Sequence, residues 1–489
     1  MICQNCYTLL HQYHILMINR LCLICLFAFS FTINSFAQKL PDPIGATPNK
    51  YQLEWQDMEY YMFIHFGPNT FTDKEWGHGD EDPKIFNPKK LDARQWARTA
   101  KAAGMKAIII TAKHHDGFCL FPSKYSTHTV RESAWKDGKG DVLKELSAAC
   151  KEYGLKFGVY LSPWDRNHPD YGTPKYNDIF AKTLNEVHTQ YGPIFEQWFD
   201  GAKGENEKKQ DYDFPKFYEV VRRNNPQAII FSDIGPDARW MGNENGIAGE
   251  TNWATLNTDG FGVGADAPAA KVLNTGDEGG KYWIPAEVDV SIRPGWFYSA
   301  ATDDKVKTLK ELESIYNTSV GRNSNLLLNV PVNRDGLIHP ADSTRLMELR
   351  RFLDAAYKTN LAKGKKVTTA PATKAAVTSN LTDGNTNTAW TIDGAGKGVD
   401  VTIDLGKATS FNRIVLQEYI KLGQRVKRFT VAYWDGKAYK SLGDHTTIGH
   451  KRILSFPTIT SSKIKITFTE TLGTNPVLSE IGIYKAPEL

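Results

Sequence analysis

Between residues 55 and 335, unbroken apolar segments alternate with amphipathic ones, and this alternation constrains the fold more than any other feature of the chain. The apolar segments, such as "MKAIIIT" at 105–111 and "LKFGVYLS" at 155–162, predict parallel strands buried on both faces of a sheet. The intervening segments begin at Asp92 or Asp141 and end at a glycine, as capped helices do. Because the length fits eight such units, a (β/α)8 TIM-like barrel is favoured over an open doubly wound sheet.

The pattern changes near residue 360, where Lys, Thr, Ala and Pro become frequent. Short alternating segments such as "VDVTIDLG" at 399–406 follow, separated by turn residues and without a helical pattern. This succession is typical of an antiparallel β-sandwich. We therefore expect a barrel domain over residues 48–358 and an all-β domain over residues 362–489.

Residues 1–37 have the features of a signal peptide. Arg20 precedes "LCLICLFAFSF" at 21–31, an apolar run too short to span a bilayer, and Ala37 ends a small-residue cleavage pattern. We expect translation to start at Met17. The mature protein is then expected to be secreted or periplasmic, without a membrane span.

Composition narrows the function classes. The formal net charge is +4 and no basic block occurs, so nucleic-acid binding is not expected. The glycine-rich "GFGVGADA" at 260–267 follows no predicted strand, so we interpret it as a flexible loop rather than a nucleotide-binding turn. Beyond the signal peptide only Cys119 and Cys150 remain, and two free core thiols are expected, with one disulfide as the alternative.

Polar side chains follow several of the predicted strands. In a parallel barrel, the carboxyl ends of the strands and the loops after them form the functional face. The candidates there are His65, Lys113, His114, His115, Asp116, Tyr160, Trp164, Asp165, Asp200 and Asp233, followed by Arg239, Trp240, Glu244 and Glu250 on the loop 235–253. One histidine at a strand end is usually structural, but three at the ends of two strands would each need a buried partner, which favours a shared pocket.

Two further groups remain open at this stage. Glu287 and Asp289 alternate with valines as in a strand, so they either face the pocket or form a structural ion pair with Arg293. Trp240 and Trp296 are either core residues or walls of the pocket.

The carboxylates indicate the chemistry. Two carboxylates, aromatic walls and no phosphate-binding signature are typical of glycoside hydrolysis. Such an enzyme keeps one carboxylate ionised and one carboxylic acid protonated. Asp200, in "QWFDGA", ends a rigid strand near histidines and suits the ionised role, while Glu244 or Glu250 on a loop suits the acid.

Two other classes remain possible from the residues alone. A metal-dependent hydrolase could use His65, His114, His115 and Asp200, although adjacent residues of a strand point in opposite directions. A non-catalytic carbohydrate-binding protein could use the barrel as a scaffold. Turnover with and without a chelator separates these three classes.

Several motifs resemble, in order, those of glycoside hydrolase family 29, the α-L-fucosidases. They include "MFIHFGPNTF", "EWGHGDEDP", "AKHHDGFCLFPSKYSTHTV", "GVYLSPWD", "EQWFDGA", "RWMGNENGIAGETNW" and "SIRPGWFY". The resemblance implies a retaining double displacement without a catalytic cofactor, acting on fucosylated oligosaccharides or glycoconjugates. By the same resemblance, Asp200 is the nucleophile.

The "GNE" segment resembles that of the subfamily specific for α-1,3/1,4-linked fucose in branched, Lewis-type glycans, with a broad-specificity α-L-fucosidase as the alternative. This implies Glu244 as the acid/base, with Glu250 as the alternative if the loop is aligned one motif away. The fucose-binding residues that the resemblance implies are His65, Trp76, His114, His115, Tyr160, Arg239 and Trp296.

The C-terminal domain resembles discoidin-like domains of the coagulation factor 5/8 C-terminal type, which include carbohydrate-binding module family 32. The motifs that carry this resemblance are "LTDGNTNTAW" at 381–390 and "SEIGIY" at 479–484. They imply a structural Ca²⁺ held by Asp383, Asn385, Thr388 and Glu480, since oxygen ligands on a tight turn suit a hard cation. The alternative is a turn without an ion.

Overall fold

The structure, a computed structural model, describes residues 40–372, 377–392 and 398–489. The predicted signal peptide at residues 1–37 lies outside these described residues. Among the helices that the structure describes, none is long and apolar enough to cross a membrane.

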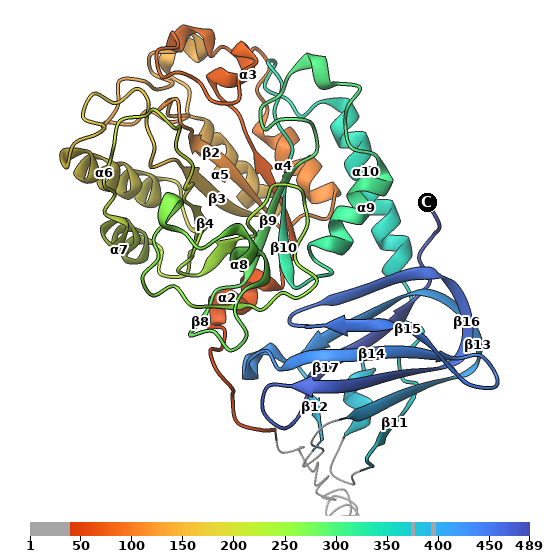
Figure 1. Cartoon of the computed structure of the whole chain (residues 1–489). Helices are drawn as coiled ribbons and strands as arrows, with labels where there is room; N and C mark the ends of the chain where they lie inside the picture. Colours follow the sequence, from red (N-terminus) through yellow and green to blue (C-terminus); the bar gives the residue numbers. More distant parts are fainter. Residues whose placement is uncertain (1–39, 373–376, 393–397) are drawn as a thin grey trace, which may run out of the picture. The chain divides into compact units, whose positions relative to one another are not determined.

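Eight parallel strands form a closed barrel in the order β1-β10-β9-β6-β5-β4-β3-β2, which confirms the predicted (β/α)8-type fold (Figure 1). The strands are β1 Tyr60–Ile64, β2 Ala107–Lys113, β3 Lys156–Leu161, β4 Ile194–Trp198, β5 Ile229–Ser232, β6 Ala238–Trp240, β9 Ala286–Ser291 and β10 Ser324–Asn329. Their residues are almost all buried, as expected for strands covered by side chains inside the barrel and by helices outside it.

Helices surround the barrel, and two of them begin at the predicted caps Asp92 and Asp141. The helices are α2 Lys50–Gln56, α3 Pro68–Thr72, α4 Ala93–Ala102, α5 Val142–Tyr153, α6 Lys175–Gln190, α7 Phe214–Asn224, α8 Ala270–Thr275, α9 Leu309–Thr318 and α10 Pro340–Tyr357. The side chain of Asp92 accepts hydrogen bonds from the backbone of Arg94 and Gln95 at the start of α4. Gly154 ends α5 in the left-handed conformation that a glycine adopts without strain.

The β5–β6 connection departs from the regular alternation. Only five residues, Asp233 to Asp237, join these two parallel strands, and they contain no helix. Between β6 and β9 the chain instead forms the small pair β7 Thr255–Leu256 and β8 Tyr282–Trp283, together with α8. β6 lies within the loop predicted at 235–253, because three residues are too few to show a strand period.

One apolar core lies between the barrel strands and the surrounding helices, and Cys119 and Cys150 lie in it as free thiols, as predicted. A second core fills the inside of the barrel and also holds buried polar groups. Inside the barrel, the Trp55 Nε1 donates a hydrogen bond of 2.8 Å to Glu196, and Trp198 Nε1 donates one of 2.7 Å to Glu287. Burial raises the pKa of both glutamates, and their proximity raises that of Glu196 further, so the pair retains a proton at neutral pH.

The C-terminal domain is antiparallel, with strand order β12-β17-β13-β16-β14-β15 and with β11 paired to β13. The strands are β11 Lys366–Ala370, β12 Trp390–Thr391, β13 Val399–Glu418, β14 Val426–Trp434, β15 Tyr439–Thr446, β16 Arg452–Thr471 and β17 Val477–Tyr484. Two predicted strands, at 399–406 and 411–419, are one continuous strand β13 with irregular pairing between them. Register shifts of this kind bend a long strand and let it enclose an apolar core.

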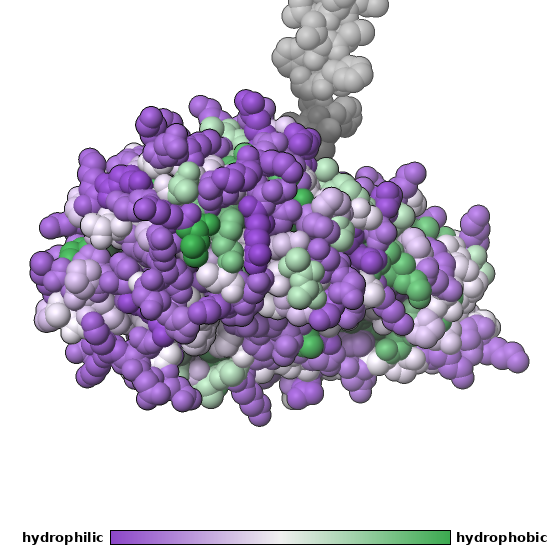
Figure 2. All heavy atoms as spheres, turned by 90° about the horizontal axis from the view of Figure 1, so that it is seen from above, coloured by the Kyte–Doolittle hydropathy of each residue, from purple (hydrophilic) through white to green (hydrophobic). Residues whose placement is uncertain are grey.

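The face of the molecule shown in Figure 2 is largely hydrophilic, with apolar side chains in small separate groups. Such scattered apolar residues are ordinary on a protein surface. A pocket is therefore a better candidate for a binding site than this face.

Candidate active site

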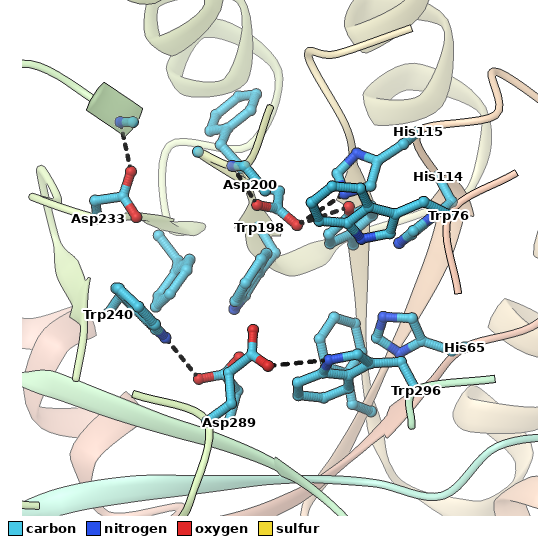
Figure 3. A pocket seen from close by; sticks show the side chains of 18 residues that line it. His65, Trp76, His114, His115, Trp198, Asp200, Asp233, Trp240, Asp289 and Trp296 are labelled. Atoms are coloured by element: carbon cyan, nitrogen blue, oxygen red, sulfur yellow. Dashed lines mark hydrogen bonds and ion pairs between the residues drawn. The ribbon is translucent and has the colours of Figure 1, made fainter. Parts of the chain in front are cut away.

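A pocket of about 260 Å³ lies at the carboxyl ends of the barrel strands. Its walls come from β1, β2, β3, β4, β5, β6 and β9 and from the loops that follow them (Figure 3). The predicted site residues that line it are His65, Trp76, His114, His115, Tyr160, Asp200, Glu244 and Trp296. The barrel thus brings together residues that are up to 231 positions apart (296 − 65) in the chain.

Asp200 lies two residues beyond the end of β4, and its carboxylate is held by donors on both oxygens. Tyr160 donates a hydrogen bond of 2.9 Å from its hydroxyl to Oδ2, and the Ala202 backbone donates one of 2.7 Å to Oδ1. The His115 Nε2 lies 3.6 Å from Oδ2. The hydrogen bonds stabilise a negative charge on Asp200, which is what a carboxylate nucleophile requires.

The histidines of the pocket are neutral and leave ring nitrogens available. Burial lowers the pKa of His115 to about 4 and that of His65 to about 3. The hydroxyl of Ser162 donates to the Trp164 carbonyl at 2.7 Å, so His115 Nδ1, 2.8 Å from that hydroxyl oxygen, must donate to it. Neutral His115 therefore presents Nε2 to the pocket as an acceptor.

His65 and His114 also leave a ring nitrogen available to a ligand, although their contacts differ from those of His115. His65 Nδ1 lies 2.9 Å from Oδ1 of Asn329, an oxygen that only accepts, so Nδ1 carries the proton and Nε2 is an acceptor. His114 stacks on Tyr160, and its buried Nδ1 has no hydrogen-bond partner within the described residues. Buried ring nitrogens without a protein partner fit a site that binds sugar hydroxyls.

Glu244 occupies a different environment from Asp200. It follows β6, and its Oε2 accepts a hydrogen bond of 3.2 Å from Trp296 Nε1. Burial raises the pKa of Glu244, and the negative charges of Asp200 and Glu75 raise it further. The pocket therefore combines a carboxylate stabilised as an anion with a carboxyl group that tends to keep its proton.

Aromatic rings form the remaining walls. Trp296 packs on His65 with 5.0 Å between ring centroids, and the exposed Trp76 meets His115 edge-on at 5.6 Å. Trp240, on β6, donates from Nε1 to the buried Asp289 at 2.9 Å. Trp240, Trp296 and Asp289 thus line the pocket, which resolves the alternatives left open for them.

The structure overturns the expectation that Arg239 binds the sugar. Its guanidinium is fully buried and donates to the carbonyl oxygens of Leu273, Ile284 and Trp253 and to the Asn252 side chain. Trp240, the next residue of β6, lines the pocket, so strand alternation turns Arg239 to the outside of the barrel.

Two other expectations fail on geometry. Glu250, the alternative acid/base, lies outside the pocket, is 67% exposed, and pairs with Arg322 at 3.3 Å and Arg452 at 3.8 Å. Arg293 pairs with Asp342 at 2.8 Å and with Asp303 at 2.9 Å, so the suggested structural ion pair with Glu287 and Asp289 does not form.

Trp198 and Gly264 line the pocket without having been predicted. For Trp198 a signal existed, because Glu196, Trp198 and Asp200 share the period of two that places side chains on one face of a strand. For Gly264 no local signal existed, because it reaches the pocket through contacts between loops.

The four predicted Ca²⁺ ligands lie close together in the C-terminal domain. Asp383 accepts from the Asn385 backbone at 2.7 Å and from the Thr388 hydroxyl at 2.8 Å, and Glu480 accepts from the Gly384 backbone at 3.0 Å. Burial and the charge of Asp383 raise the pKa of Glu480 to about 7. In the described part of the chain, no group of three or more His, Cys, Asp and Glu side chains has the arrangement of a metal site.

A closed parallel barrel that holds two carboxyl groups between aromatic walls, at the carboxyl ends of its strands, is typical of a glycosidase of the barrel class. The sequence profile of the family described as "Alpha-L-fucosidase" matches residues 42–357, and that of the "F5/8 type C domain" matches residues 365–481. The chain belongs to the alpha-L-fucosidase family.

Individual relatives agree with this assignment. The chain is 41% identical over 450 residues to "Putative alpha-L-fucosidase 1" of Oryza sativa subsp. japonica, covering 91% of this chain and 86% of that protein. It is 40% identical to "Alpha-L-fucosidase 1" of Arabidopsis thaliana, covering 94% of each chain. A solved structure of a Ruminococcus gnavus GH29 fucosidase in complex with fucose is similar, with TM-score 0.84, 34% identity, and coverage of 93% of this chain and 98% of that one.

Proposed function

We propose that this α-L-fucosidase works by retaining double displacement, with Asp200 as nucleophile and Glu244 as acid/base. The observation that supports this is the opposite environment of the two carboxyl groups, which share one pocket. Asp200 receives hydrogen bonds on both oxygens, whereas burial raises the pKa of Glu244. In the first step, Asp200 attacks the anomeric carbon while Glu244 protonates the glycosidic oxygen, so the aglycone leaves and a fucosyl ester of Asp200 forms. In the second step, Glu244 takes a proton from a water that attacks the anomeric carbon, and the ester bond to Asp200 breaks. No cofactor enters either step.

The remaining pocket residues are proposed to bind the fucose. His65 and His115 would accept hydrogen bonds from sugar hydroxyls through Nε2, and His114 lies between them with an unpartnered ring nitrogen. The faces of Trp76 and Trp296 would hold the apolar C6 methyl group of a deoxysugar. The similar Ruminococcus gnavus enzyme, solved in complex with fucose, is consistent with a pocket for this sugar.

The experiment that tests the mechanism removes each carboxylate in turn. Asp200→Asn should lower kcat by at least about 10³-fold, since no covalent intermediate forms. Glu244→Ala should also lose most activity, and added azide should restore it because a small anion can replace the water that Glu244 activates. Glu250→Ala is the matched control and should stay near wild type. A dead, azide-rescued Glu250→Ala beside an active Glu244→Ala would refute the assignment.

The stereochemistry gives an independent test. Proton NMR should detect α-fucose as the first product, because two inversions at the anomeric carbon amount to retention. Early β-fucose would contradict the double displacement.

We further propose a preference for α-1,3/1,4-linked fucose in Lewis-type glycans. The support is the resemblance of the "GNE" segment, which contains Glu244, to that of the corresponding subfamily. A panel of fucosylated oligosaccharides and an aryl fucoside tests this. Hydrolysis of α-1,2-linked fucose or of the aryl fucoside at the rate found for Lewis trisaccharides would contradict it.

Two proposals concern other parts of the chain. The turn of Asp383, Asn385 and Thr388, together with Glu480, would bind Ca²⁺, because two carboxylates lie close together there and burial disfavours the charge of Glu480. The segment 1–37 would direct the protein to the periplasm or the exterior. Mass spectrometry of the mature protein should then find Gln38 at its N-terminus.

A further inference from the structure

Three loops meet directly beside Asp200. Gly201 follows Asp200 beyond β4, Asp233 is the first residue after β5, and Gly264 lies in the glycine-rich segment 260–267 between β7 and α8. Gly201, Asp233 and Gly264 all line the pocket. The segment that the sequence suggested was a flexible loop thus forms part of the wall next to the proposed nucleophile.

A hydrogen bond joins two of these loops. The Gly264 backbone N–H donates to Asp233 Oδ2 at 2.6 Å, a short distance typical of a charge-assisted bond (Figure 3). Figure 3 places Asp233 on the opposite side of Asp200 from His114, His115 and Trp76. Asp233 therefore lines the side of the pocket away from these three proposed fucose-binding residues.

The same contact excludes side chains at both glycines. A Cβ on Gly201 would lie 1.9 Å from Asp233 Oδ2, and a Cβ on Gly264 would lie 2.8 Å from the Gly201 carbonyl oxygen. Real Cβ atoms do not approach other atoms so closely, and the second obstacle is backbone that cannot rotate away. The three loops are therefore in direct contact, without space for even one methyl group.

We propose that Asp233 is a positioning residue that holds the 260–267 loop against Gly201 and thereby fixes the carboxylate of Asp200. The link is short, because Gly201 lies between Asp200 and Ala202, whose N–H donates to Asp200 Oδ1. A displaced Gly201 would move both the carboxylate and its donor. This inference rests on the proposed role of Asp200 as nucleophile.

Two glycines of the same loop provide a matched test. Gly264 and Gly260 both have left-handed backbones, with φ of +78° and +85°, so alanine strains both similarly. A Cβ on Gly260 meets nothing within 4 Å, whereas one on Gly264 meets Gly201. Gly264→Ala should lower kcat by about 10²-fold with little change in KM, because the nucleophile is misplaced. Gly260→Ala should keep wild-type kinetics.

A second set of variants tests Asp233 itself. Asp233→Asn retains an oxygen that can accept from the Gly264 N–H and should keep most of kcat, whereas Asp233→Ala should lose it. Gly201→Ala should inactivate the otherwise wild-type enzyme but lower kcat much less in an Asp233→Ala background, since the clashing oxygen is gone. Such non-additivity is expected only of residues that act through one contact.

The kinetics of these variants support or refute the positioning role of Asp233. Circular dichroism first establishes that the variants are folded at the assay temperature. Equal kinetics of Gly264→Ala and Gly260→Ala, or additive effects of Gly201→Ala and Asp233→Ala, would overturn the positioning role. An active Asp200→Asn enzyme would instead refute the proposed mechanism, so the two failures are distinguishable.

Discussion

At the scale of single residues, the surroundings of a carboxyl group decide its role more than its chemical type. Asp200 has a tyrosine hydroxyl and a backbone N–H as donors, whereas Glu244 has an indole N–H and two nearby negative charges. The first environment stabilises an anion and the second stabilises a carboxylic acid. The residue types alone could not separate the two proposed roles, whereas the contacts favour Asp200 as the nucleophile and Glu244 as the acid/base.

The charge of Glu75 provides a test of this balance. Glu75 accepts from the Trp296 backbone at 2.7 Å and is one of the charges that raise the pKa of Glu244. Glu75→Gln keeps a side-chain oxygen for that hydrogen bond but removes the charge. The pKa of Glu244 should fall, so the acid loses its proton at lower pH. The alkaline limb of the pH profile of kcat/KM should move to lower pH, and a move to higher pH would contradict this account.

At the scale of elements, β6 shows what alternation does in a strand of three residues. Trp240 faces the pocket, while Arg239 faces outward into a set of backbone carbonyls. Arg239 therefore holds the segment between β6 and β9 in place rather than binding substrate. Because the buried guanidinium of Arg239 donates hydrogen bonds to four groups, its role is structural.

Substitutions at Arg239 and Trp240 should therefore affect different properties, stability in the first case and kinetics in the second. Arg239→Met should destabilise the protein by about 3–5 kcal/mol, because it leaves buried carbonyl oxygens without donors. Trp240→Phe should instead change kinetics, since it removes the N–H that Asp289 accepts. Thermal unfolding and steady-state kinetics of both variants distinguish the roles. A large KM increase in folded Arg239→Met, with unchanged stability, would restore Arg239 as a binding residue.

The same element shows how far the sequence could predict the structure. Strand–helix alternation predicts the barrel, and strand ends predict His65, Tyr160 and Asp200, because these signals are local. β6 is too short to show a period, so neither its existence nor the orientation of Arg239 could be predicted. The approach of Gly264 to Gly201 depends on two loops far apart in sequence, and no local pattern encodes such a contact.

At the scale of the whole molecule, catalysis and the proposed Ca²⁺ site lie in different domains. The carboxyl groups proposed to be catalytic belong to the barrel, while Asp383 and Glu480 belong to the antiparallel domain. A chelator should therefore act on stability and leave the chemistry intact. The titration of Glu480 predicts the pH range in which removal of Ca²⁺ lowers the stability of the protein.

Burial raises the folded-state pKa of Glu480 to about 7 from an ordinary value of 4.5, so the ionised form destabilises the fold progressively as pH rises through this interval. Ca²⁺ would offset this charge. Its addition should raise Tm at pH 8 and have little effect at pH 5, while EDTA leaves kcat unchanged at either pH. Glu480→Gln should abolish the Ca²⁺ effect on Tm. A Tm that ignores Ca²⁺ at pH 8 would indicate a turn without an ion.

The position of Trp76 has a practical consequence. All 12 tryptophans lie in the described residues, and among them only Trp76 is exposed, at 45%. Its indole stands at the pocket, in contact with His115 and Trp164. A bound sugar would cover this ring and withdraw it from water, which shifts indole emission to shorter wavelength. By the proposed contact of Trp76 with fucose, the enzyme would carry an intrinsic fluorescent reporter of pocket occupancy, and a Trp76→Phe variant would supply its background.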